Sequence, residues 1–283
     1  MSGSAQNTAV PVGAEAKPAS PRSRLGARRP GAFLDLGVQV GVVLALCVAW
    51  EAGARLGAIN PFLLPPLTDV LARIGEDAMS GAVFVDLGLT LYRALFGFLI
   101  AAVIGIPVGI LMSRSRIVRW FFDPLLSIGF PMPKVAFLPI FILWFDIYDT
   151  SKVIMVAFSC FFPIAAATYA GTTGLDKWPI WSARSFGAKE VEILWEVNLP
   201  MALPQILTGL QVALPVGMIT TVVTEMLMGG RGIGGSMIMA GRFADSVGVF
   251  AGIVEIVALG FLVVKSLELV RARLLAWHPE TRR

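Results

Sequence analysis

The 283-residue chain has little charge, little cysteine and almost no histidine. Charged side chains make up 15% of its residues, whereas a soluble domain carries about 25%. Hydrophobic residues make up 56%, and the mean hydropathy is +0.77. So little charge excludes a surface that mostly faces water. The composition instead predicts an all-α polytopic membrane protein.

Potential metal ligands and catalytic groups are equally sparse. Cys47 and Cys160 lie far apart in apolar segments, without a CxxC pair, which argues against a disulfide framework or a zinc site and predicts two buried structural thiols. His278 is the single histidine, so neither a metal cluster nor a catalytic triad can be assembled around histidine. Paired catalytic groups are missing, which disfavours an intramembrane enzyme.

The chain also lacks a phosphate-binding loop of the form GxxxxGK[ST], so we expect no cofactor and no ATP to be bound by this chain. Gly230, Gly232 and Gly235 formally spell GxGxxG. That fingerprint requires a preceding β-strand, whereas here it follows an apolar helical segment, and we interpret it as a turn. If transport is driven by ATP, the ATPase must be a separate chain.

Long apolar runs are what the sequence does contain. A helix crosses the roughly 30 Å hydrocarbon core with about 20 residues. Scanning on that rule predicts about six membrane helices, at residues 34–54, 88–112, 120–146, 152–170, 204–228 and 246–269. Residues 31–275 would form the transmembrane domain, flanked by a disordered basic tail at 1–30 and a short tail at 276–283.

Lysine and arginine cluster on one side of these spans, so the modest net charge of +4 reflects topology rather than nucleic-acid binding. The clustered residues are Arg22, Arg24, Arg28, Arg29, Arg114, Arg116, Arg119, Lys177, Arg184, Lys189, Arg271, Arg273, Arg282 and Arg283. The opposite side has only Arg55, Arg73, Lys152, Arg231 and Arg242. The positive-inside rule then places both termini in the cytoplasm.

One cytoplasmic loop, at about residues 175–198, is too polar to span the membrane. Its spacing predicts a short helix that ends at Gly187 and a second one with Val191, Leu194 and Trp195 on one face. Pro200 and the following Pro204 would then break the helix. Two interpretations remain: an amphipathic hairpin lying on lipid, or a projection that docks in a groove of a soluble partner.

A second candidate site lies within the third span, where Pro131-Met132-Pro133 precedes Lys134. An intramembrane lysine costs about 2.5–3.5 kcal/mol on insertion scales. It either pairs with an acid, of which Glu225 is a candidate, or lines the substrate path. Glu225 invites the same two interpretations, whereas Arg93 is expected to be an anchor at the membrane interface.

The polar loop resembles the EAA loop of ABC importer permeases. That pattern is Glu-Ala-Ala, three residues, Gly, nine residues, Ile, one residue and Leu-Pro. This chain has Trp181-Ser182-Ala183, then Gly187, then Val197-Asn198-Leu199-Pro200, so the spacing, the glycine and Leu-Pro match and the glutamate is replaced. The resemblance implies an ATPase-coupling loop whose contact residues are Ala183, Phe186, Gly187, Ala188, Val191, Leu194, Leu199 and Pro200.

The resemblance covers roughly residues 60–275. Within the family, the chain is similar to the nitrate, sulfonate, taurine and bicarbonate branch. The resemblance is carried by TLYRALFGF (90–98), PMPKVAFLPIFILWF (131–145), LPMALPQILTGL (199–210) and TEMLMGGRGIG (224–234). Such permeases usually have a glycine where this chain has Asp146.

The resemblance implies a type I ABC importer permease of the bacterial inner membrane that translocates a small anionic solute. Its partners would be membrane lipid, a second copy of itself, two ATPase subunits and a periplasmic or lipid-anchored solute-binding protein. The alternative is an ion-coupled secondary transporter, which normally has midplane acids and inverted repeats. Glu225 is almost the only such acid here, and no internal symmetry is visible.

Overall fold

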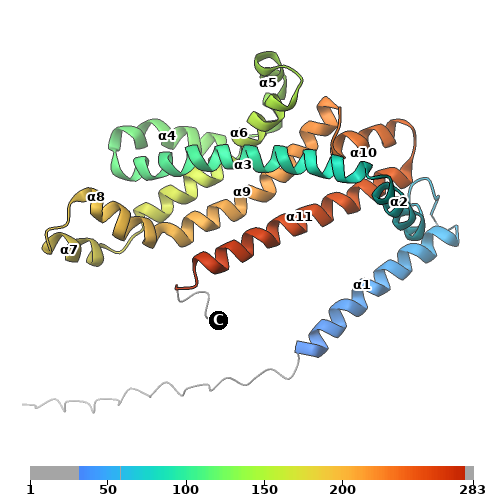
Figure 1. Ribbon diagram of the computed structural model, residues 1–283, viewed down its shortest axis with the longest axis horizontal. Helices are drawn as coiled ribbons and strands as arrows, with labels where there is room; N and C mark the ends of the chain where they lie inside the picture. The colour runs from blue at the N-terminus through green and yellow to red at the C-terminus, as the bar shows by residue number, and fades with distance from the viewer. Residues whose placement is uncertain (1–31, 58, 278–283) are drawn as a thin grey trace, which may run out of the picture. The chain divides into compact units, whose positions relative to one another are not determined.

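The computed structural model describes residues 32–57 and 59–277 (Figure 1). The chain divides into two compact units, Met1–Val48 and Ala49–Arg283. The predicted tail at 1–30, His278 and most of the predicted tail at 276–283 lie outside the described residues.

Helices make up the regular structure of the described part, as the sequence predicts. They are α1 (Ala32–Arg55), α2 (Leu67–Ser80), α3 (Ala82–Arg114), α4 (Arg116–Gly129), η1 (Lys134–Phe137), α5 (Leu138–Phe145), α6 (Asp149–Thr173), α7 (Lys177–Ser185), α8 (Glu190–Glu192), η2 (Ile193–Asn198), α9 (Leu199–Met228), α10 (Ile233–Arg242) and α11 (Ser246–Leu274).

Within the larger unit, α3, α6 and α9 pack against one another and hold most of the core. Small residues on α3 allow the close approach. A Cβ at Gly97 would lie 2.6 Å from Val156 Cβ, and one at Gly109 would lie 2.6 Å from Thr168 Cβ. The buried Cys160 lies in this core, whereas Cys47 in the other unit is only half-buried, so the prediction of two buried thiols is correct for Cys160 alone.

The predicted spans largely coincide with helices long and apolar enough to cross a membrane. Five such helices occur among the described residues, covering 37–55, 82–114, 149–173, 190–228 and 246–274. Together with a bent pair of helices they would make six. Many large apolar side chains on α3 and α11 are exposed, as lipid-facing or subunit-facing surfaces require.

The third expected span, 120–146, is not one straight helix. α4 ends at Gly129, and α5 begins at Leu138 after a bend of 104°. The cause is local, since Pro131 and Pro133, two positions apart, both lack a backbone N–H to donate, and the short 3₁₀ turn η1 follows them. This segment is a broken span or a re-entrant loop.

Candidate functional site

The two ends of the α3–α6–α9 bundle each carry a candidate functional site. In Figure 1, α7 and α8 lie at one end of α9, and α10 lies at the other. We call Lys177–Glu192 the α7–α8 segment and Gly229–Gly235 the glycine loop.

The α7–α8 segment consists of two short helices joined at a glycine. α7 follows Asp176, whose side chain accepts a hydrogen bond from the backbone N–H of Trp178 at 3.2 Å. Gly187 has φ +86°, a conformation that L side chains rarely adopt. The backbone N–H of Ala188 donates to the carbonyl of Ala183 at 3.1 Å and closes the bend. The expected helix–glycine–helix geometry is therefore present.

Polar side chains of this segment pair with one another at the surface. Arg184 contacts the Glu190 carboxylate at 2.8 Å, and Arg114 at the end of α3 contacts it at 3.4 Å. The backbone N–H of Lys189 donates to the Glu192 carboxylate at 2.8 Å and caps α8. Ion pairs this exposed contribute only about 0–1 kcal/mol, so backbone hydrogen bonds define the shape of the segment.

A π-helical turn, η2, follows α8 and changes which residues are buried. Ile193 and Asn198, five positions apart, are buried, while Val191 and Trp195 are exposed and Leu194 is half-buried. The expected shared apolar face of Val191, Leu194 and Trp195 stays a prediction, since none of the three side chains is buried within the described chain. Hydrogen bonds from residue i to i+5 widen the turn and shift the phase that a 3.6-residue period assumes.

The expected helix break at Pro200 and Pro204 is also wrong. The helical backbone runs continuously from Glu190 through η2 and α9 to Met228. Pro200 falls in the first turn of α9, directly after η2, where the usual ladder of i→i−4 hydrogen bonds is already interrupted.

Lys134 stands at the bend between α4 and α5, and its charge has no acidic partner among the described residues. Its ammonium donates to the carbonyl of Phe130 at 2.9 Å and to that of Met132 at 3.5 Å. It also lies 5.4 Å from the centroid of the Phe162 ring. The interpretation in which Glu225 neutralises Lys134 is therefore wrong.

Glu225 pairs with Arg93 instead. The Arg93 Nη1 lies 2.5 Å from Glu225 Oε1, and the two side chains are 4% and 0% exposed. The Thr90 hydroxyl also donates to this carboxylate, at 2.9 Å, and Arg93 reaches Asp149 at 2.7 Å. Arg93 is thus no anchor at the membrane interface. Its partner Glu225 is 132 positions away in sequence, so no local pattern could indicate the pair.

The same buried groups bind the glycine loop. Arg93 donates to the carbonyl of Arg231 at 2.7 Å, and buried Lys152 donates to that of Gly229 at 2.9 Å. Backbone N–H groups of the loop donate to side chains on α3 and α9. These bonds are Gly232 to Asp86, Ile233 to Thr90 and Gly234 to Glu225, each at 3.1 Å. The GxGxxG sequence forms a turn, as expected, and one that is extensively hydrogen-bonded.

Glycine is required in this loop for space as well as for conformation. Gly229, Gly230 and Gly232 have φ of +70°, +89° and +119°. A Cβ at Gly232 would lie 2.5 Å from Glu225 Oε1, and one at Gly235 would lie 2.0 Å from the carbonyl oxygen of Gly230. A side chain there would therefore displace either the buried ion pair or the loop backbone.

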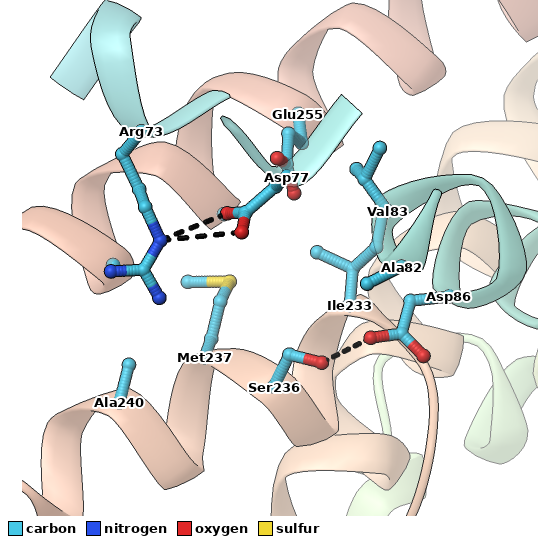
Figure 2. A pocket seen from close by; sticks show the side chains of 12 residues that line it. Arg73, Asp77, Ala82, Val83, Asp86, Ile233, Ser236, Met237, Ala240 and Glu255 are labelled. Atoms are coloured by element: carbon cyan, nitrogen blue, oxygen red, sulfur yellow. Dashed lines mark hydrogen bonds and ion pairs between the residues drawn. The ribbon is translucent and has the colours of Figure 1, made fainter. Parts of the chain in front are cut away.

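A cavity of about 220 Å³ adjoins the glycine loop, between α2, α3, α10 and α11 (Figure 2). In its wall Arg73 binds Asp77 at 3.1 Å and Asp245 at 3.2 Å. Burial alone would lower the pKa of Arg73, but these carboxylates outweigh burial and raise the pKa above its ordinary value. Across the cavity the Ser236 hydroxyl donates to Asp86, so the cavity and the glycine loop share one polar side chain.

Comparison with known proteins decides the family. Residues 97–275 match the binding-protein-dependent transport system inner membrane component family, over more than half of the chain. The chain belongs to this family.

Curated relatives of this permease carry related names. It is 36% identical over 248 residues to the taurine transport system permease protein TauC of Escherichia coli, covering 86% of this chain and 90% of the relative. It is 32% identical over 257 residues to a putative aliphatic sulfonates transport permease protein SsuC of Bacillus subtilis, covering 91% and 92%. It is 34% identical over 239 residues to the formylaminopyrimidine transport permease protein ThiX of Halalkalibacterium halodurans, covering 84% and 94%.

Its fold matches a solved importer. A chain of the inward-facing MetNI methionine ABC transporter superposes with a TM-score of 0.62 at 17% identity, covering 70% of this permease and 98% of that chain. The expected type I importer permease fold is therefore confirmed. The permease is a multi-pass inner membrane transport subunit, and the family implies an ATPase that hydrolyses ATP and a binding protein as its partners. A secondary transporter is the wrong class.

The structure separates the expected site residues into two groups. The coupling-loop candidates lie in or next to the α7–α8 segment, whereas Lys134 and Glu225 belong to different clusters. Sequence reasoning missed the buried Lys152 and the half-exposed Asp149, which interact with the glycine loop and with Arg93 respectively. One signal was present in the sequence, because Thr90 and Arg93 are three positions apart and therefore share a face of an apolar helix.

Proposed function

We propose that two copies of this permease form the path of an ATP-driven importer for a small anion of the sulfonate or carboxylate class. The observation that carries the anion is Lys134, an ammonium group next to broken helix that no carboxylate neutralises among the described residues. The taurine and sulfonate relatives agree with this choice. A formylaminopyrimidine relative of similar identity does not, so Lys134, rather than the names of relatives, supports an anionic solute.

Lys134 would act as an attractive charge on the path, together with the polar backbone that Pro131, Met132 and Pro133 leave outside regular helix. Its present partners are carbonyl oxygens and an aromatic face, which an arriving anion can complement without displacing a carboxylate. Glu225 is fully buried and bound by Arg93. Instead of contacting the solute, it would fix the conformation of the glycine loop.

Uptake by Lys134→Met tests the anion. We expect uptake of labelled taurine or another small sulfonate to fall at least about tenfold, as removal of a charge-assisted contact implies, with folding and ATPase assembly intact. Lys265→Met is the matched control, because Lys265 on α11 also lies over an aromatic ring, that of Phe261, but its charge is paired with Glu268. Equal uptake by Lys134→Met and wild type would remove Lys134 from the path.

The α7–α8 segment would transmit ATPase movement to the membrane helices. It faces the cytoplasm if both termini do, as the basic residues predict. η2 joins this segment to α9 without a break in the helix, so a force on α8 would reach the membrane directly. The contact residues would be those of the resembled loop, Ala183, Phe186, Gly187, Ala188, Val191, Leu194, Leu199 and Pro200. A periplasmic or lipid-anchored binding protein would deliver solute at the opposite side.

Gly187→Trp tests this coupling. No atom lies within 4 Å of a Cβ at Gly187, so the isolated permease has room for a side chain there. In the complex, the tryptophan would clash with the groove of the partner. Co-purification with the ATPase should be lost, with normal membrane insertion. Gly81→Trp is the control, because Gly81 also has positive φ and open space but lies at the start of α3. Unchanged uptake in Gly187→Trp would identify the segment as a lipid-bound hairpin.

A further inference from the structure

Glu255 is a carboxylate inside the apolar helix α11, and its side chain points into the cavity between α2, α3, α10 and α11 (Figure 2). It follows Ser246, the first residue of α11, by nine positions, which is about 14 Å along the helix axis. A carboxylate this far inside a membrane span is costly and is normally paired. The Glu255 Oε1 atom is buried, and among the described residues it has no hydrogen-bond donor and no cationic partner.

The other carboxylates that line the cavity have partners. Asp77 is bound by Arg73 at 3.1 Å, and Asp86 accepts a hydrogen bond from the Ser236 hydroxyl. The wall contains three carboxylates and one guanidinium, and this guanidinium is already bound to Asp77. The cavity therefore combines an excess of negative charge with a free acceptor oxygen on Glu255.

The rest of the wall indicates which cation would fit. Val83, Ile233 and Met237 give the cavity an apolar side next to the carboxylates. Its volume of about 220 Å³ equals that of about seven waters at about 30 Å³ each, which is enough for a small organic molecule. Among the residues that the structure describes, no three acidic, histidine or cysteine side chains are placed to hold a metal ion. A cation with N–H donors and a short carbon chain matches both sides of the cavity.

We propose that this cavity binds a primary ammonium group on a short carbon chain, with Glu255 as its charge partner. The ammonium would donate a charge-assisted hydrogen bond to Glu255 Oε1 and neutralise the carboxylate. The Ser236 hydroxyl would serve as a further acceptor, and the carbon chain would contact Val83 and Met237. The proposal is independent of the anion path, because Lys134 is not part of this wall.

A proton on Glu255 is the competing explanation, since a neutral carboxylic acid is cheaper to bury than an unpaired carboxylate. A proton requires neither a cavity of this volume nor an apolar side to it. Both features are present beside Glu255, and they favour a ligand with a carbon chain.

Thermal unfolding of the purified full-length permease in lipid nanodiscs tests the site, with ethylammonium chloride as the probe. We expect saturating ethylammonium to raise the Tm of wild type by at least about 3 °C. Tetramethylammonium chloride carries the same charge without an N–H and should leave the Tm unchanged.

The variants place the effect at Glu255. Glu255→Gln removes the unpaired charge and keeps the shape of the side chain, so it should fold and lose the response to ethylammonium. Glu255→Asp keeps the charge and should retain part of the response. Glu268→Gln is the matched control, because Glu268 lies on the same helix but is exposed and paired with Lys265. Its response should equal that of wild type.

A free amine and the ammonium end of a zwitterionic solute share this chemistry, and taurine and isethionate distinguish the two sources. The two compounds carry the same sulfonate on two carbons, but isethionate has a hydroxyl in place of the ammonium. If the site accepts a zwitterion, taurine should raise the Tm of wild type but not that of Glu255→Gln, and isethionate should raise neither. If it accepts free amines alone, ethylammonium should act and taurine should not.

Three results would overturn the proposal. An equal ethylammonium response in wild type and Glu255→Gln would place the binding elsewhere. An equal response to tetramethylammonium would reveal a nonspecific ionic effect. No response in wild type would mean that Glu255 holds a proton instead of a ligand. None of these results concerns the anion path, which Lys134→Met tests separately.

Discussion

Arg93 and Glu225 at the glycine loop lie 2.5 Å apart with almost no exposure, whereas Arg184 and Glu190 in the α7–α8 segment lie 2.8 Å apart and are more than half exposed. Both are close ion pairs of the same chemical types. At the glycine loop the pair also receives the Thr90 hydroxyl and the backbone N–H of Gly234. Burial, rather than ion-pair distance, therefore makes the first pair structural, whereas the second pair is screened by solvent.

Replacing the arginine of each pair should give the largest difference in stability between the two ends of the bundle. Arg93→Met leaves a carboxylate buried without its charge partner, which costs about 3–5 kcal/mol, so we expect little folded protein. Arg184→Met should cost less than about 1 kcal/mol. Thermal unfolding of the detergent-solubilised permease measures both.

The control for that comparison is the double variant Arg93→Met/Glu225→Leu. Replacing both charges by apolar groups removes the unpaired carboxylate and should recover part of the folded protein, but not all of it, because the backbone N–H of Gly234 and the carbonyl of Arg231 lose their partners. Comparable stability of Arg93→Met and Arg184→Met would contradict the contrast between the two ends.

The same contrast explains what the sequence could and could not predict. Apolar runs predict the spans because membrane burial depends on composition along one helix, and the bend at Gly187 follows from a local pattern. The Arg93–Glu225 pair joins α3 to α9 across 132 positions, so it is a property of packing alone. The turn η2, in which Ile193 and Asn198 are buried, escaped prediction because a π-helical turn has no signature in residue spacing.

Glycine substitutions should give the next largest difference. A Cβ at Gly235 would lie 2.0 Å from a backbone oxygen, so Gly235→Ala should destabilise the permease toward the upper end of about 1–3 kcal/mol. Gly187→Ala meets no atom within 4 Å, and only its φ of +86° opposes it, at about 1–2 kcal/mol. Tm values of the two variants measure the difference.

Gly88→Ala is the reference for both substitutions. Gly88 is helical and open, and alanine there should stabilise the permease by about 0.5–1 kcal/mol. A Gly235→Ala variant as stable as Gly88→Ala would mean that the glycine loop is not tightly packed.

The smallest expected effect concerns Asp146. This residue lies outside both the glycine loop and the α7–α8 segment, and its backbone is strained. Its φ of 71° and ψ of −179° lie in a region that is essentially restricted to glycine and costs about 1–3 kcal/mol. The resembled family usually has glycine at this position. Part of the strain is offset, because the Asp146 carboxylate accepts a hydrogen bond from the backbone N–H of Ile147 at 2.8 Å.

Asp146→Gly should therefore stabilise the permease by about 1 kcal/mol after the backbone entropy of glycine is subtracted. Asp146→Ala should destabilise it, because alanine keeps the strain and loses the hydrogen bond. Thermal unfolding of both variants checks the opposite signs, and a stabilising alanine would show that the carboxylate, not the backbone, is the source of the strain.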